Sequence, residues 1–222
     1  GDVDVIIPRG GKSIIETISK NSKVPTIKHL EGLCHTFWDE GYDKDKATEV
    51  IANAKLRRPE ICGATETLLI HSNNSAEDIS SVLDNLKSQG CEIIGCSRLK
   101  DIYSIDRDAT EEDWSTEYLD KKITVKLVDN VEECVEHINK YSSGHTESCL
   151  SNNQQSIEYF FQNCKSAILM NNASTQFADG GEFGFGAEIG ISTDKLHVRG
   201  PVGAKHLTTF KYQVIGNHTT RP

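Results

Sequence analysis

Hydrophobic side chains recur along the chain at two different spacings, and segments with the two spacings alternate. Four segments have apolar residues every three or four positions, as helices with one buried face do: residues 44–56, 76–88, 131–138 and 155–162. Four short apolar or alternating runs have the spacing of strands: residues 67–70, 91–95, 123–128 and 167–170. Regular alternation of strands and helices predicts an α/β fold with a mainly parallel sheet.

The two ends of the chain have patterns of their own. Near the start, residues 3–7 and 26–30 read as short strands, with an amphipathic helix between them that follows Gly10 and Gly11. Residues 101–120 are acidic and irregular, which predicts an excursion over the surface. Residues 207–215 return to alternation after a Gly-Pro-Val-Gly turn, which predicts an extended arm that leaves the body.

Composition and charge exclude several classes of function. The chain of 222 residues has a formal net charge of -9, which argues against binding nucleic acid or an anionic membrane. Its 7 cysteines are an odd number with irregular spacing and no C-x-x-C pair, which argues against a disulfide framework or a structural metal site. No apolar run approaches the ~20 residues of a membrane span. We therefore expect a cytoplasmic protein with reduced thiols.

Cys62 is the candidate nucleophile. It lies in a turn of small residues immediately before an apolar strand, an arrangement that holds a thiol at the end of a rigid element. Arg57 and Arg58 precede it, and positive neighbours favour the reactive thiolate. From these residues alone, a buried structural cysteine is the favoured interpretation, and the family resemblance described below reverses that preference.

Several blocks of the sequence resemble gamma-glutamyl phosphate reductases, which are also called glutamate-5-semialdehyde dehydrogenases and belong to the aldehyde dehydrogenase superfamily. The blocks cover residues 8–13, 28–35, 57–70, 141–147 and 172–203. The last block is the most specific, since it combines Asn-Ala-Ser-Thr-Gln-Phe, Gly-Gly-Glu-Phe-Gly and Arg-Gly-Pro-Val-Gly. The resemblance runs across the whole chain but covers only the C-terminal half of the family's usual length.

This resemblance implies a fold and a domain division. The fold would be an aldehyde dehydrogenase-like catalytic domain, with a parallel sheet in three αβα layers. Residues 1–37 would be the last strands of a Rossmann-like NADPH-binding domain, and residues 38–195 the catalytic domain. Residues 196–222 would form a return segment and an oligomerisation strand.

The resemblance also implies an activity. The family reduces gamma-glutamyl phosphate to glutamate 5-semialdehyde and phosphate with NADPH, through a thioester on the residue that corresponds to Cys62, in proline biosynthesis. A homodimer or higher homo-oligomer is expected, and glutamate 5-kinase is a candidate partner. The backbone N–H of Cys62 could stabilise negative charge on the substrate's carbonyl oxygen.

Further residues receive roles from the same resemblance. Gly10, Gly11 and Lys12 would lie at the edge of the NADPH site, although a plain tight turn explains them equally well. His29, also expected at the cofactor site, stands where hydrolytic aldehyde dehydrogenases carry a water-activating Glu, which fits an enzyme that must not hydrolyse its thioester; a strand-end histidine with a satisfied hydrogen bond is the alternative. Glu117 would accept hydrogen bonds from the nicotinamide ribose, with a solvated surface carboxylate as the alternative.

Four residues are candidates for contact with the substrate. Arg199 and Arg58 could bind its carboxylate or phosphate through two parallel hydrogen bonds, or could serve loop carbonyls instead. Phe177 and Phe183 could wall a substrate tunnel, although core packing is the usual role of Phe.

Two other functional classes remain open at this stage. The chain could be a folded but catalytically incompetent fragment whose arm, residues 207–215, mediates oligomerisation by strand addition. It could also be a different thiol enzyme, such as a Cys-His hydrolase, but nothing in the sequence brings His71 or His137 to Cys62.

Overall fold

Seven parallel strands form the main sheet of the computed structural model, which describes residues 2–28 and 31–222. In space the strands follow the order β4-β3-β5-β2-β1-β6-β7, and every hydrogen-bonded pair is parallel. Their bounds are Cys34–Trp38 (β1), Thr65–His71 (β2), Glu92–Gly95 (β3), Arg107–Asp108 (β4), Lys122–Val128 (β5), Thr146–Leu150 (β6) and Ile168–Asn171 (β7). The predicted α/β class with a mainly parallel sheet is confirmed.

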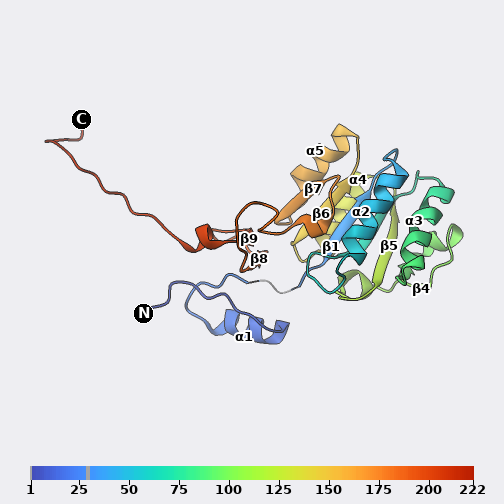
Figure 1. Cartoon of the computed structure of the whole chain (residues 1–222), viewed down its shortest axis with the longest axis horizontal. Coiled ribbons are helices and arrows are strands. Elements are labelled where there is room, and N and C mark those ends of the chain that lie inside the picture. The colour runs from blue at the N-terminus through green and yellow to red at the C-terminus, as the bar shows by residue number, and fades with distance from the viewer. Residues whose placement is uncertain (1, 29–30) are drawn as a thin grey trace.

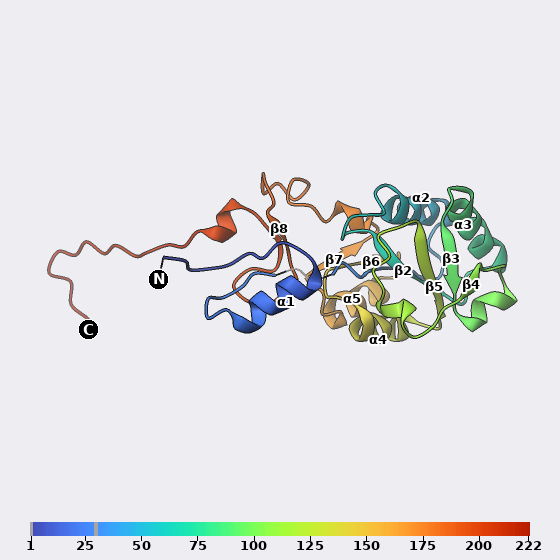
Figure 2. The same cartoon turned by 90° about the horizontal axis from the view of Figure 1, so that it is seen from below.

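Helices cover both faces of this sheet, which gives the three predicted layers. In Figure 2, α2 and α3 lie on one side of the strands, and α4 and α5 lie on the other. The four helices span Lys44–Leu56 (α2), Ala76–Ser88 (α3), Val131–Tyr141 (α4) and Gln154–Asn163 (α5). Among the described residues, no helix is long and apolar enough to cross a membrane.

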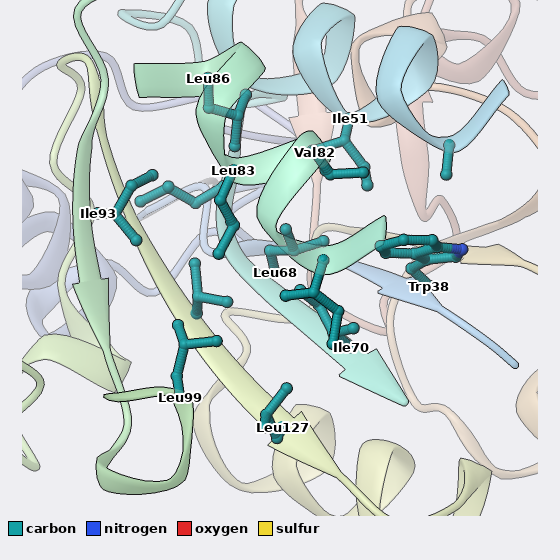
Figure 3. Packing of buried hydrophobic residues seen from close by; sticks show 14 of the residues in the cluster. Trp38, Ile51, Leu68, Ile70, Val82, Leu83, Leu86, Ile93, Leu99 and Leu127 are labelled. Carbon is teal, nitrogen blue, oxygen red and sulfur yellow. The ribbon is translucent and has the colours of Figure 1, made fainter. Parts of the chain in front are cut away.

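Alternate residues of the central strands supply two separate cores. Leu68 and Ile70 of β2 pack under α2 and α3 together with Trp38 of β1 (Figure 3). Phe37 and Leu69 point to the other face and pack against α4 and α5. Each such side chain contributes about 1.5–3 kcal/mol when fully buried, so both layers hold the sheet rigid under the site.

Helix ends follow the capping signals in the sequence. The carboxylate of Asp43 accepts a hydrogen bond of 2.9 Å from the N–H of Lys46, which confirms the predicted start of α2. Ser75 caps α3 in the same way. Gly90 follows the end of α3 with φ +84, a conformation that favours glycine.

Two neighbouring strands of the sheet, β1 and β6, were not predicted. Every residue of both strands is buried, and several of them are polar. Because β1 pairs with β2 and β6, residues 34–37 belong to the large sheet. The predicted domain boundary after residue 37 falls within this strand, and the division into domains stays a prediction.

A smaller assembly lies beside the sheet and combines both ends of the chain (Figure 1). It contains α1 (Lys12–Asn21) and the antiparallel pair β8 (Gly190–Ser192) and β9 (Gly200–Val202). The strands predicted at residues 3–7 and 26–30 are reduced to one bridge between Ile6 and Thr26, and the last two residues of the second lie outside the described part. Ile27 packs with Val198 and Val202, so the return segment covers the start of the chain.

The C-terminal arm leaves the body, as predicted, and extends into solvent (Figure 1). The arm follows a short 3-10 helix at Ala204–Leu207 and has no strand partner within the described chain. Four large apolar side chains on it are more than three-quarters exposed: Phe210 at 76%, Tyr212 at 85%, Val214 at 88% and Ile215 at 98%.

Candidate active site

The candidate site lies at the amino-terminal edge of the main sheet. Gly32 directly precedes β1, Cys62 precedes β2, and Glu117 precedes β5. Ser143 precedes β6 at the same edge. Because these neighbouring strands are parallel, the segments that enter them meet although they are far apart in sequence.

A tight turn presents the Cys62 thiol. The N–H of Ile61 donates to the carbonyl of Arg58 at 3.4 Å, and the N–H of Ala64 donates to the carbonyl of Ile61 at 2.9 Å. Of the seven cysteines, only Cys62 and Cys96 are not buried. Cys62 is therefore the accessible thiol at this edge of the sheet.

The segment entering β1 packs directly on the Cys62 turn. A Cβ built on Gly32 would lie 2.0 Å from the carbonyl oxygen of Cys62, so only glycine fits there. The thiol of Cys34 donates to the same carbonyl at 3.2 Å. The backbone of Cys62 is thus fixed from outside its own strand.

Burial and side chains distant in sequence set the pKa of the Cys62 thiol. The pKa of its thiol is raised to about 11, first by burial and then by the negative charges of Glu117 and Glu188. The cation that acts in the opposite direction is Arg9. Arg57 and Arg58, which were expected to favour the thiolate, are not among the largest causes of this shift, so their effect on the thiol stays a prediction.

The backbone N–H of Cys62 also acts on its own thiol. This interaction is one of the causes that lower the thiol pKa. Contact between this N–H and a carbonyl oxygen of the substrate stays a prediction.

Glu117 is part of the site and is not a solvated surface carboxylate. Its Oε1 accepts a hydrogen bond of 2.8 Å from the N–H of Gly32, and its side chain is partly buried. Burial raises the pKa of Glu117, and the nearby charge of Glu31 acts in the same direction. Glu117 therefore contacts Gly32, and Gly32 in turn packs on the backbone of Cys62.

The other residues predicted near the cofactor lie at the start of the smaller assembly. Gly10 has φ +140, and Gly11 is the N-cap of α1 without a side-chain hydrogen bond to the first turn. The backbone of Lys12 begins this helix. An uncapped helix N-terminus with glycine before it can accept a phosphate group, whereas His29 lies outside the described residues.

Arg58 and Arg199 both lie on the surface and interact with loops. The carbonyl of Arg58 accepts a hydrogen bond of 3.3 Å from the side-chain amide of Gln176, and its own side chain is exposed. The guanidinium of Arg199 donates to the carbonyl of Lys165. The structure does not bring either guanidinium to the Cys62 thiol, and their contact with substrate stays a prediction.

Phe177 and Phe183 do lie together. Their ring centroids are 6.3 Å apart, and Phe177 is 48% exposed. Phe177 follows Gln176, whose Cα lies near Gly63 in the Cys62 turn. Phe177 is thus exposed beside the turn while Phe183 is partly buried, and a substrate channel walled by the two rings stays a prediction.

Sequence reasoning missed a buried ion pair below the site. The register between β1 and β2 shifts after Cys34, so that Glu66 is an extra residue in β2. Its carboxylate pairs with Lys55 of α2 at 2.7 Å, and both side chains are almost completely buried. The other oxygen of Glu66 accepts from the N–H of Leu119 at 3.3 Å, which ties the pair to the Glu117 segment. A lysine at an inward-facing position of a helix was the available signal.

Known proteins resemble the chain over its whole length. No family model matches the chain. Over 221 residues the chain is 50% identical to the gamma-glutamyl phosphate reductase of Brucella suis biovar 1, covering 100% of this chain and 52% of that protein. A Rhizobium etli gamma-glutamyl phosphate reductase is 50% identical over 222 residues, with the same shares covered.

Solved structures agree with the sequence matches. The crystal structure of gamma-glutamyl phosphate reductase from Thermotoga maritima has a TM-score of 0.95 and 45% identity, and the match covers 99% of this chain and 53% of that one. An acetylating aldehyde dehydrogenase from Geobacillus thermoglucosidasius has a TM-score of 0.71 and 18% identity over 96% of this chain and 58% of its own, which shows a shared fold. The chain spans about half the length of the curated relatives it matches. By sequence and by fold, this chain belongs to the gamma-glutamyl phosphate reductase family.

Proposed function

We propose that the chain provides the catalytic thiol of an enzyme that reduces gamma-glutamyl phosphate to glutamate 5-semialdehyde and phosphate. The observation that carries the proposal is Cys62 itself, a partly exposed thiol whose backbone is held by neighbouring strands. The proposal is further supported by the 50% identity to reductases over the full chain. A cytoplasmic location in proline biosynthesis forms part of the same proposal.

The reaction at Cys62 proceeds through a thioester. The thiolate attacks the acyl carbon of gamma-glutamyl phosphate, and phosphate leaves with the electron pair of the broken carbon–oxygen bond. The N–H of Cys62 donates to the carbonyl oxygen as negative charge develops on it. Because phosphate is a good leaving group, this step needs no proton from the protein.

The residues present fit part of a nicotinamide dinucleotide. Glu117 has one oxygen engaged with Gly32 and a second that can accept a ribose hydroxyl. The N-terminus of α1 after Gly11 can accept a phosphate. When bound, NADPH supplies the hydride that reduces the thioester. Most of a dinucleotide site requires a complete doubly wound sheet, which these residues do not form.

Covalent capture tests the role of Cys62 directly. The chain is incubated with a small acyl phosphate such as acetyl phosphate, and acylated peptides are mapped by mass spectrometry. The Cys96→Ala variant is the matched control, because Cys96 is the other cysteine that is not buried. We expect acylation at Cys62 in the native chain and in Cys96→Ala, and none in Cys62→Ala. Equal acylation of Cys62 and Cys96 would contradict the proposal.

Activity with the natural substrates is the second test. Phosphate-dependent reduction of NADP by glutamate 5-semialdehyde is measured with the native chain and with Cys62→Ala, each mixed with the remaining half of a family member. Turnover that survives in Cys62→Ala would exclude this thiol as the nucleophile.

Assembly through the C-terminal arm is a second proposed function. Residues 207–215 expose a row of large apolar side chains and have no strand partner in the described chain. Pairing with a second copy would cover this edge. Deletion of residues 207–222 should reduce the mass in light scattering to that of a monomer, and an unchanged mass would sink the idea.

A further inference from the structure

A buried carboxylate lies behind the segment that contacts Cys62. Glu147 of β6 has no exposed surface, and four hydrogen-bond donors converge on it. The N–H and the Nδ1 of His35 lie 2.8 and 3.0 Å from Oε2, while the hydroxyl of Ser166 donates to Oε1 at 2.6 Å. The hydroxyl of Ser142 also donates to Oε1.

These four hydrogen bonds engage both oxygens of the carboxyl group. Among the described residues, Nε2 of His35 is buried without a hydrogen-bond partner, so the imidazole is held at this cluster through Nδ1. Such an arrangement is sensitive to loss of any one donor.

The same cluster holds the backbone of residues 33–35. The N–H of His35 donates to Glu147, and the hydroxyl of Ser142 lies 3.3 Å from the carbonyl oxygen of Leu33. The N–H of Leu33 donates to Ser143 at 2.9 Å. Side chains here replace the bonds of a regular ladder, and the β1–β2 register shifts at this point.

The opposite side of this segment contacts Cys62. Gly32 packs on the Cys62 backbone, and the Cys34 thiol donates to its carbonyl. Residues 32–34 are therefore held between the Cys62 turn on one side and the Glu147 cluster on the other. Displacement of Leu33 would move Gly32 as well.

We propose that Glu147 is a positioning residue for Cys62, acting through Ser142 and the backbone of residues 32–35. The carboxylate sets the distance between Gly32 and the Cys62 turn, and that distance fixes how deeply the thiol is enclosed. The importance of this positioning for turnover rests on the proposed function of Cys62. The positioning itself does not depend on that function.

A buried carboxyl group at the other end of β1 and β6 offers a matched control variant. Asp39 follows β1, is 2% exposed and accepts a hydrogen bond of 2.7 Å from Ser151, which follows β6. Asp39→Asn removes a buried charge from the β1–β6 pair without touching residues 32–34. Glu147→Gln makes the equivalent change at the site end.

The experiment measures alkylation of Cys62 by iodoacetamide in this chain between pH 6 and pH 11, with peptide mapping. Burial is the largest cause of the raised thiol pKa, so release of Gly32 admits water to the sulfur and favours the thiolate. We expect Glu147→Gln to alkylate about tenfold faster at pH 8, the effect of roughly one unit of thiol pKa. Asp39→Asn should keep the native profile even where its melting temperature falls.

Cys134 and Cys149 report on general unfolding, since both are fully buried in the sheet layers. They should stay unlabelled in every variant whose Cys62 profile is interpreted. Ser142→Ala is the milder variant if Glu147→Gln does not fold, and it should shift the Cys62 profile in the same direction. A native profile in both variants, or an equal shift in Asp39→Asn, would overturn the proposal.

The outcome is separable from that of the proposed function. Alkylation reports the environment of the thiol and requires no acyl phosphate. A shifted profile without acylation of Cys62 would refute the function and retain the positioning role. Acylation with an unshifted profile would do the reverse.

Discussion

Replacement of Lys55 by Met should destabilise the chain strongly, and in a way that depends on pH. Lys55 of α2 pairs with Glu66 at 2.7 Å, and the exposed fractions of the two side chains are 0% and 2%. Met retains most of the aliphatic volume of Lys55 but removes its charge. Glu66 would then keep one backbone donor, the N–H of Leu119.

The magnitude follows from the burial of the partner. Removal of one member of a buried ion pair costs about 3–5 kcal/mol, because the other charge is left without compensation. Domains unfold with about 5–15 kcal/mol, so this loss is a large share of the total. The double variant Lys55→Met/Glu66→Leu leaves no charge and should recover most of the loss.

The pH dependence has a defined sign. Burial raises the pKa of Glu66 to about 7 even with Lys55 present, from an ordinary value of 4.5. The folded state therefore holds this proton more tightly than the unfolded state, and stability falls as pH rises from about 4.5 to 7. Without Lys55 the folded pKa rises further, so the variant should lose up to about 1.4 kcal/mol more than the native chain per pH unit above 7.

Urea unfolding at pH 6 and pH 8 measures these differences. Lys87→Met is the control, because the pair between Lys87 and Asp106 is 2.9 Å long but 40% and 34% exposed. Exposed pairs contribute about 0–1 kcal/mol. A Lys55→Met loss no larger than that of Lys87→Met at pH 8, or a double variant no more stable than the single one, would refute the reasoning.

Three further predictions concern the thiol and its surroundings. Alkylation of Cys62 should rise about tenfold per pH unit up to pH 10, because its pKa is near 11, and should exceed that of buried Cys91; a plateau near pH 7 would contradict this. Glu117→Gln removes a charge that raises the Cys62 pKa but keeps an acceptor for the backbone, so the alkylation profile should move to lower pH, and an unmoved profile would assign the shift to burial and Glu188. Gly32→Ala should lower the melting temperature sharply or prevent folding, since its Cβ would meet the Cys62 backbone, whereas Gly11→Ala meets nothing within 4 Å and should be tolerated.

The helices were predictable from sequence because their signals are local. Asp43 caps α2, Ser75 caps α3, and the apolar spacing between the caps is regular. The predicted bounds of both helices agree with the structure residue for residue. Each signal lies within a few residues of the feature that it specifies.

Strands β1 and β6 were not predictable in the same way. In β1 the side chain of Thr36 bonds to Thr65 at 2.7 Å, and His35 bonds to Glu147 of β6. These polar residues are buried because partners on neighbouring strands satisfy them. Neither periodicity nor hydrophobicity marks such a strand, since both faces are covered and its polar partners lie 29 and 112 residues away.

The surroundings of Cys62 also depend on residues that are distant in sequence. The turn and following strand mark Cys62 in the sequence, but the charges that act on it do not come from its neighbours Arg57 and Arg58. They come from Glu117 and Glu188, which only the fold brings close. Adjacency along the chain therefore does not identify the side chains with the largest effect on the thiol.

That field has a consequence for catalysis. A thiol with a pKa near 11 is almost entirely protonated at neutral pH, whereas attack on an acyl carbon requires the thiolate. Burial and Glu117 both oppose ionisation, and Glu117 is also the carboxylate proposed to accept ribose hydroxyls. Hydroxyl donors bound to that carboxylate would spread its charge and weaken its effect on the sulfur. Ligand binding at Glu117 would thus favour the Cys62 thiolate. Without the ligand the thiol would stay protonated, which protects the nucleophile.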